Sequence, residues 1–218
     1  MFENVGPAGA KNLSLDFEEL FQKYHLKIRG IIHVGAHYGQ ESDIYQKFRI
    51  NNLVFFEPLS KNFEILQSHV GQNAKLFQKA LGNENKKVKM YVEKANNGMS
   101  SSILKPKKHL KQYPNIVFDS EEMVDMVRLD DILEEQDNYN FLIIDVQGYE
   151  LEVLKGSRET LQNIDYILSE VNRDELYENC VRVEQLDDFL AQFNFQRLET
   201  NWEGGTWGDA FYVKSLKE

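Results

Sequence analysis

The sequence is poor in cysteine and has no long apolar run. Cys180 is the only cysteine among 218 residues, which excludes an internal disulfide and a thiolate metal cluster and predicts a reducing compartment, the cytoplasm. No apolar run approaches the roughly 20 residues of a membrane-spanning helix. Residues 1–12 lack the charged-then-apolar pattern of a secretion signal, so we expect a flexible lead followed by a single domain over residues 13–218.

Positive charge is also scarce. The chain carries 25 Lys and Arg against 35 Asp and Glu, a formal net charge of −10. Apart from the segment Lys105-Pro106-Lys107-Lys108, the lysines are scattered, so no basic stripe offers a track for a phosphate backbone. We therefore expect no nucleic-acid partner. Internal repeats and low-complexity tracts are absent from the sequence as well.

The most informative segment is an apolar run that leads into a glycine-bounded turn, residues 30–41 (GIIHVGAHYGQE). A second apolar run over residues 52–56 ends in Glu57-Pro58. The carboxylate follows Gly35 by about 20 residues, the spacing at which an acid after the second strand can bind ribose hydroxyls. Together the two segments predict a nucleotide-type cofactor site.

The glycine spacing distinguishes two cofactors. A dinucleotide fingerprint needs a middle glycine so that the backbone can approach a pyrophosphate, but here His37 stands between Gly35 and Gly39. S-adenosylmethionine (SAM) has an adenosine that Glu57 can hold and carries no phosphate, so the turn favours SAM over NAD. Taken alone, the turn is equally compatible with a βαβ connection that binds no ligand.

Alternating strand and helix patterns predict an α/β fold with a Rossmann-like sheet. A first helix over residues 13–24 can be capped by Ser14 or Asp16. The last two strands, 195–201 and 210–214, have no helix between them and predict an antiparallel hairpin at the end of the sheet. The other expected elements are strands at 31–34, 53–56, 74–81, 86–93, 141–146 and 165–171, and helices at 60–69, 149–161 and 183–193.

Several short motifs, in this order, resemble the FkbM family of SAM-dependent methyltransferases over about residues 28–214. They are Ile32-His33-Val34-Gly35-Ala36, Phe56-Glu57-Pro58, the serine-rich loop 96–102, Val127-Arg128-Leu129-Asp130-Asp131-Ile132-Leu133, Ile144-Asp145-Val146-Gln147-Gly148-Tyr149-Glu150 with Val153-Leu154-Lys155-Gly156, and Ser169-Glu170-Val171-Asn172. One position departs from the family, whose members often carry an acid where this chain has His33.

The resemblance implies a class I methyltransferase fold: a seven-stranded, mostly parallel sheet with an antiparallel last strand and helices on both faces, here with an extra N-terminal helix. It also implies SAM as the methyl donor, and hydroxyls on sugars or polyketide-like natural products as acceptors. We expect the glycine turn, the acid after the second strand, the third strand and the serine-rich loop to bind SAM. The expected residues are Gly35, Ala36, Tyr38, Gly39, Gln40, Glu41, Glu57, Pro58, Ala80, Ser100 and Ser101.

Asp145 is the first candidate for a catalytic base. Methyl transfer to an alcohol requires the acceptor proton to leave, and a positioned carboxylate or imidazole can accept it. Asp145 ends a buried strand at the edge where open α/β sheets bind ligands, Glu170 ends the next strand, and His109 is the best-placed imidazole. In the alternative interpretations, Asp145 caps the following helix, and His109 is a solvated loop residue.

Asp145 and Glu170 have no clear third partner, so we expect no metal site. Trp202, Trp207 and Tyr177 are candidates for an aromatic wall against a sugar ring, or else core residues. The predicted function is O-methylation of a sugar, glycan or related polyhydroxylated metabolite, by a chain that can be one domain of a larger glycan-assembly polypeptide. The alternatives are an NAD-dependent oxidoreductase, and a noncatalytic binding module that would not need the two acids.

Overall fold

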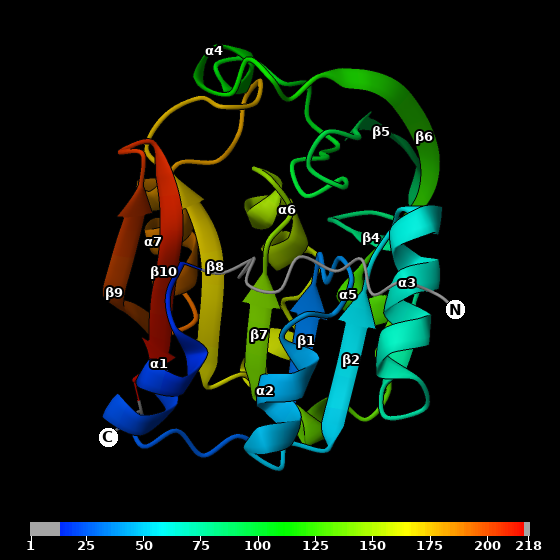
Figure 1. Ribbon diagram of the computed structural model, residues 1–218. Coiled ribbons are helices and arrows are strands. Elements are labelled where there is room, and N and C mark those ends of the chain that lie inside the picture. Colours follow the sequence, from blue (N-terminus) through cyan, green and yellow to red (C-terminus); the bar gives the residue numbers. More distant parts are fainter. Residues whose placement is uncertain (1–13, 216–218) are drawn as a thin grey trace.

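The computed structural model describes residues 14–215, so the flexible lead predicted for residues 1–12 lies outside the described residues. Its main feature is a seven-stranded sheet with the order β3-β2-β1-β7-β8-β10-β9 (Figure 1). The strands are β1 (Gly30–Val34), β2 (Asn52–Phe56), β3 (Lys75–Phe77), β7 (Phe141–Ile144), β8 (Tyr166–Asn172), β9 (Phe195–Glu203) and β10 (Trp207–Lys214).

The strand directions confirm the predicted sheet. The pairs β1 with β2, β2 with β3, β1 with β7 and β7 with β8 are parallel, whereas β10 is antiparallel to both β8 and β9. The predicted hairpin is present, but β10 inserts between β8 and β9, so β9 forms the sheet edge.

Helices cover both faces of the sheet, which explains why β1 and β7 are apolar and buried along their whole length. Figure 1 shows α1 (Phe17–Lys23) and α2 (Ser42–Lys47) in front of the sheet and α7 (Val183–Ala191) behind it. Phe17, Leu20 and Tyr45 pack with Phe141 on the first face, together with residues of α3 (Ser60–Val70). Asp16 caps α1 by accepting hydrogen bonds from the backbone N–H groups of residues 18 and 19.

A second, three-stranded sheet was not expected from the sequence. The strand predicted over residues 74–81 divides, because β3 joins the main sheet and β4 (Ala80–Leu81) joins β6 (Phe118–Val127), which also pairs with β5 (Lys86–Glu93). The first half of β6 has no fully buried position, so its sequence lacks the alternation that marks a half-buried strand.

Three helical segments also differ from expectation. α4 (His109–Gln112) and α5 (Leu129–Ile132) each span a single turn, too short for a periodic pattern. The helix predicted over residues 149–161 is interrupted, because α6 (Glu150–Lys155) ends at Gly156 and a 3₁₀ turn, η2 (Thr160–Gln162), follows; a second 3₁₀ turn is η1 (Gln136–Asn138). Within residues 14–215, the longest apolar helices fall short of what a membrane crossing requires.

Candidate active site

A cavity of about 310 Å³ lies at the carboxyl ends of β1, β2, β7 and β8. The ends of parallel strands are where open α/β sheets bind ligands. Ala80 and Met90 of the small sheet and the loop before α4 line the cavity from the opposite side. The second sheet therefore closes a site that the main sheet begins.

Gly35 forms the part of the cavity wall directly after β1. Its φ is +79°, and a Cβ atom there would lie 1.8 Å from the backbone oxygen of Asp145. The backbone N–H groups of Gly35 and Ala36 both donate to the oxygen of Phe56, at 2.9 and 3.0 Å. Only glycine fits this turn, because both the backbone conformation and the close approach of β7 exclude a side chain.

Glu57 fastens the turn to the end of β2. Its Oε2 accepts from the N–H of His37 and its Oε1 from the N–H of Leu59, both at 2.9 Å. Burial raises the pKa of this carboxyl to about 8. Each oxygen keeps a second lone pair, so the carboxyl can still bind ribose hydroxyls from the cavity that it lines.

His37 is a neutral imidazole whose tautomer is fixed by its neighbours. Gln40 accepts from the N–H of Tyr38 through Oε1 at 3.1 Å, so its Nε2 faces His37 Nδ1 at 2.9 Å and donates to it. The ring proton therefore sits on Nε2, which donates to the backbone oxygen of Asn97 at 2.9 Å. Burial lowers the pKa of His37, in keeping with a neutral ring that joins the turn to the serine-rich loop.

The serine-rich loop forms another part of the cavity wall. Glu93 at the end of β5 accepts from the N–H groups of Asn96 at 2.6 Å and Ser100 at 3.4 Å. Among the sequence-predicted cofactor residues, those that line the cavity are Gly35, Glu57, Pro58, Ala80, Ser100 and Ser101. The others, all within residues 36–41, are not among the residues that line the cavity: Ala36, Tyr38, Gly39, Gln40 and Glu41.

Asp145 and Glu170 line the same cavity from adjacent strands. The Gln147 side chain lies against both carboxyls, donating from Nε2 to Asp145 Oδ1 at 2.8 Å and to Glu170 Oε2. Burial raises the pKa of both acids, and the charge of Asp145 raises that of Glu170 further. The pKa of Glu170 is therefore raised more than that of Asp145, so Glu170 takes up a proton before Asp145 does.

Gln147 is a site residue that the sequence analysis did not single out. Its backbone φ is +56°, and its Oε1 accepts from the hydroxyl of Tyr177 at 2.9 Å. The available signal was its place between Asp145 and Gly148, where a left-handed backbone aims the side chain back at the strand ends. Its partners Glu170 and Tyr177 are remote in sequence, so the sequence did not indicate that Gln147 contacts them.

Glu150 supports this loop from the first turn of α6. Its Oε1 accepts from the N–H groups of Val146 at 3.3 Å and Gly148 at 2.9 Å, whereas its Oε2 is buried without a partner. Burial raises the pKa of Glu150 to about 7. Glu150, and not Asp145, therefore binds the N–H groups before the helix.

His109 is buried rather than solvated, with 3% of its surface exposed. It begins α4 and lies 5.0 Å from the ring of Tyr113 and 5.4 Å from that of Tyr177, centroid to centroid. Its Nδ1 is buried without a hydrogen-bond partner, and burial lowers its pKa to about 4. A neutral imidazole therefore lines the cavity.

Only one of the three proposed aromatic-wall residues lines the cavity in the described structure, namely Trp207. Its Nε1 donates to the hydroxyl of Tyr113 at 2.7 Å, which fixes the indole. Tyr177 is fully buried, and Trp202 packs against the core with Arg173 3.7 Å above its ring. His33 is likewise a core residue, within hydrogen-bond distance of the Tyr45 hydroxyl at 3.2 Å.

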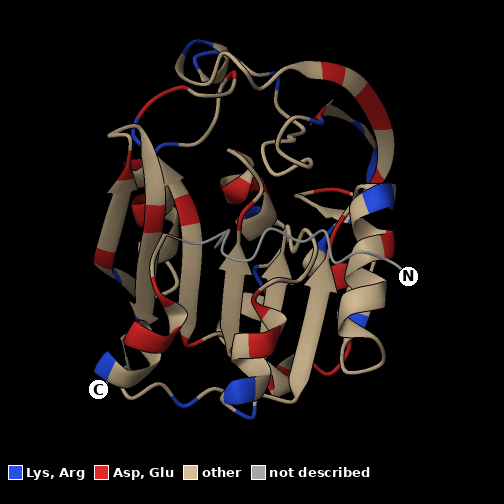
Figure 2. Cartoon of the chain, in the orientation of Figure 1, with Lys and Arg blue, Asp and Glu red and all other residues tan. Residues whose placement is uncertain are grey.

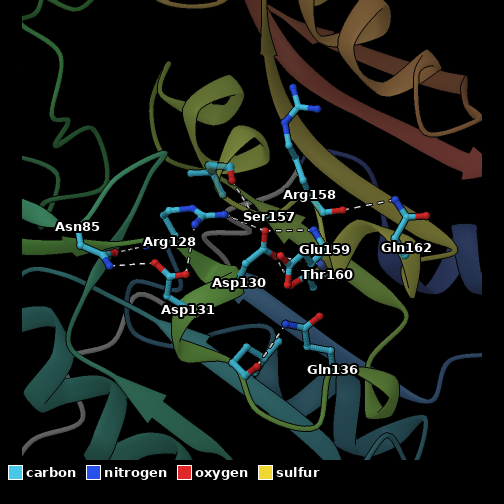
Figure 3. A network of polar contacts seen from close by, with 12 residues as sticks. Asn85, Arg128, Asp130, Asp131, Gln136, Ser157, Arg158, Glu159, Thr160 and Gln162 are labelled. Carbon is cyan, nitrogen blue, oxygen red and sulfur yellow. Dashed lines mark hydrogen bonds and ion pairs between the residues drawn. The ribbon is translucent and has the colours of Figure 1, made fainter.

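The Arg-Leu-Asp-Asp motif lies outside the cavity and has a structural role (Figure 3). Asp130 accepts from the N–H and the hydroxyl of Thr160, both at 2.9 Å, and from the N–H of Glu159 at 3.1 Å. Arg128 and Asp131 both contact Asn85. The motif therefore joins the small sheet to the segment after α6.

The fold is that of Rossmann-like, class I methyltransferases. A magnesium protoporphyrin IX methyltransferase from Synechocystis PCC 6803, solved with bound SAM, matches 91% of this chain and 76% of its own with a TM-score of 0.51 and 10% identity. A SAM-dependent methyltransferase from Aquifex aeolicus matches 91% and 89%, with a TM-score of 0.50 and 10% identity. These likenesses concern the fold.

The chain belongs to the family described as the methyltransferase FkbM domain, whose model matches residues 33–197. It is also 28% identical over 189 residues, 82% of this chain and 76% of the relative, to the 2-O-methyltransferase NoeI of Sinorhizobium fredii. The resemblance seen in the sequence is thereby confirmed. The protein is a methyltransferase, and its cofactor is SAM. The family assignment favours methyl transfer over the NAD-dependent alternative.

Proposed function

We propose that this chain is an O-methyltransferase that transfers the methyl group of SAM to a hydroxyl of a sugar, a glycan or a related polyhydroxylated metabolite. The observation that carries the proposal is the carboxyl pair Asp145 and Glu170, held by Gln147 in the wall of the cavity that also contains the glycine turn. The name of the relative NoeI, a 2-O-methyltransferase, supports oxygen as the accepting atom.

The residues of the cavity divide the work. Gly35, Glu57 and the serine-rich loop would hold SAM, which supplies an electrophilic methyl group when bound. Asp145 accepts the proton of the attacking hydroxyl at its carboxylate, because the pKa of Glu170 is raised further and Glu170 is protonated first. Gln147 keeps the two carboxyls in place, and a carboxylate at Asp145 suits a site that must also hold a sulfonium cation.

The test is a methylation screen. The protein is incubated with SAM and a set of glycans and polyhydroxylated small molecules, and the products are read by mass spectrometry for the gain of one methyl group. Linkage analysis then shows whether the methyl group is on oxygen. Asp145→Asn serves as the matched control. Methylation at nitrogen or carbon would contradict the proposal, and SAM binding without any product would favour the noncatalytic alternative.

Two further proposals concern the setting of the reaction. We place it in the cytoplasm, since Cys180 is buried and unpaired, as expected in a reducing compartment. We also propose that the chain can act as one domain of a larger glycan-assembly polypeptide. Affinity purification of the native protein, followed by size measurement and localisation of an epitope-tagged chain, tests both statements.

A further inference from the structure

Carboxyl groups outnumber lysines and arginines among the side chains that line the cavity. Glu57, Asp145, Glu170 and Glu203 line it, and among its described lining residues Lys79 is the sole lysine or arginine. Lys79 is paired with Asp125 at 2.8 Å and follows β3, at the opposite edge of the main sheet from β9 and β10. The part of the cavity around Tyr113, Glu203 and Trp207, where we place the acceptor and which we call the acceptor end, therefore presents no lysine or arginine to an incoming molecule.

The basic segment above the cavity does not change this balance. Lys107 is paired with Glu175 at 2.6 Å, Lys108 with Asp174 at 2.6 Å, and Lys105 contacts Glu178 at 3.5 Å. Figure 2 shows the blue of α4 beside the red of the chain that follows β8. These lysines hold two segments together and do not line the cavity.

The acceptor end also offers an apolar platform with fixed geometry. Trp207 lines the cavity, its Nε1 donates to Tyr113 at 2.7 Å, and Tyr113 also accepts from Gln112 Nε2 at 3.0 Å. Ile116 and Leu176 line the same region. An aromatic face bordered by a few polar acceptors suits a sugar ring, which has apolar C–H faces and hydroxyl donors at its rim.

From this arrangement we infer that the acceptor is a sugar ring without an anionic group, stacked on Trp207, and that uronic acids and sugar phosphates are excluded from the cavity. The inference rests on the proposed function, whose acceptor class it narrows. Its physical basis is that a carboxylate or phosphate would enter a low-dielectric site beside Asp145 and Glu203, where the one lysine among the described lining residues is already paired with Asp125.

Binding is measured apart from methyl transfer. The protein is saturated with S-adenosylhomocysteine and titrated with methyl glycosides of glucose, galactose and mannose and with the matching uronides and 6-phosphates, by saturation-transfer NMR and calorimetry. We expect the uncharged member of at least one set to bind tenfold or more tightly than its anionic partners. Equal or tighter binding of the anionic members, or no binding of any member, would overturn the inference.

Variants test whether the discrimination between uncharged and anionic sugars arises in the cavity. Trp207→Ala should weaken binding of the uncharged glycoside about tenfold while circular dichroism stays unchanged. Glu203→Lys, at the exposed tip of the β9–β10 hairpin, should reduce the discrimination against uronides to a few-fold, whereas Glu64→Lys, an equal charge change on α3 outside the cavity, should not. An identical effect of the two lysine substitutions would show that net charge, and not the cavity, discriminates.

The two proposals can fail separately. Selective binding of an uncharged glycoside that is never methylated would refute the O-methyltransferase proposal and support the inference. Methyl transfer to a uronide or a sugar phosphate as efficient as to its uncharged partner would do the reverse.

Discussion

Gln147 connects backbone conformation to chemistry at the scale of a single residue. A left-handed φ costs a non-glycine residue about 1–2 kcal/mol, and here it brings one amide into contact with Asp145, Glu170 and Tyr177. The contacts compensate for the strain, and the result is a pair of carboxyls held beside one amide. The predictions at this scale concern that pair and its support.

Asp145→Asn tests the base. The substituted amide oxygen can still accept from Gln147, but it cannot take up the acceptor proton. We expect SAM affinity within a few-fold of the wild type and turnover lower by about 10²–10⁴. Glu170→Gln should lose less and His109→Ala least, measured by calorimetry and single-turnover methylation. An active Asp145→Asn variant beside an inactive His109→Ala variant would assign the proton to the imidazole.

Glu150→Gln tests the buried carboxyl beside the pair. The amide oxygen can keep both bonds to Val146 and Gly148, and the nitrogen takes the place of the unpartnered Oε2. Because the folded-state pKa of Glu150 is raised to about 7, its contribution to stability is complete below its unfolded pKa of about 4.5 and is lost as the pH rises to 7.

The unfolding free energy of the variant, measured relative to that of the wild type, should therefore increase by about 2 kcal/mol as the pH rises from 5.5 to 7.5. Urea unfolding of both proteins at the two pH values measures the difference, in which the titration of other groups cancels. A stability difference independent of pH would mean that Glu150 is ionised throughout.

At the scale of elements, two of the short motifs noticed in the sequence prove to have different roles. The glycine turn after β1 lies in the cavity wall, whereas the Arg-Leu-Asp-Asp motif before and within α5 holds loops together away from it. Both were noticed as short patterns of special residues. Only their position relative to the sheet edge distinguishes the turn that lines the cavity from the motif that joins two loops.

Gly35→Val should abolish SAM binding and lower stability, because the new Cβ would overlap the backbone oxygen of Asp145. Gly71→Val is the matched control, since Gly71 also has a positive φ of +61° but has open space around its Cβ position. The control should lose about 1–2 kcal/mol of stability and keep its SAM affinity. Calorimetry measures the SAM affinity of both variants. Retained binding by Gly35→Val would show that SAM does not bind at this turn.

Asp130→Ala should cost about 2–4 kcal/mol of unfolding free energy. The carboxylate is only 2% exposed, and its removal leaves several donors around η2 without a partner. SAM affinity of the folded variant should stay within about twofold of the wild type. Asp131→Ala, whose side chain is 40% exposed, should cost less than about 1 kcal/mol. Denaturant unfolding and SAM titration give both numbers, and loss of SAM binding at full stability would place the motif in the site.

At the scale of the whole molecule, two sheets enclose the site, and four carboxyl side chains and one lysine are among its described lining residues. Such a cavity raises the question of a divalent cation. Within residues 14–215, no group of three or more His, Cys, Asp and Glu side chains is arranged to hold a metal ion. Asp145 and Glu170 contact the amide of Gln147 instead.

We therefore expect methylation activity to stay within about twofold of its starting value after treatment with EDTA, because hydrogen bonds and not a cation organise the carboxyls. The measurement is turnover of the best acceptor before and after chelation and dialysis. Loss of turnover that Mg²⁺ or Mn²⁺ restores would recast Asp145 and Glu170 as ligands.

Much of the fold follows from local patterns. The buried strands β1, β2 and β7 were predicted within two residues because helices cover both of their faces and demand continuous apolar runs. The sequence also indicated a glycine at position 35 and an acid at the end of β2. Each of these residues directly follows its strand in the chain, so a local pattern includes both. β6 and α4 were not, because a half-polar strand and a single helical turn carry no periodic signal.

The sequence by itself thus determined the α/β alternation, the cofactor turn and the acids at the strand ends. The tertiary structure decided that β10 enters between β8 and β9, that a second sheet covers the cavity, that His109 is buried and neutral, and that Gln147 lies between the two carboxyls. Each of these depends on contacts between residues far apart in the chain, such as Gln147 with Tyr177. Short-range patterns cannot encode such contacts, because packing and desolvation act only after the elements have met.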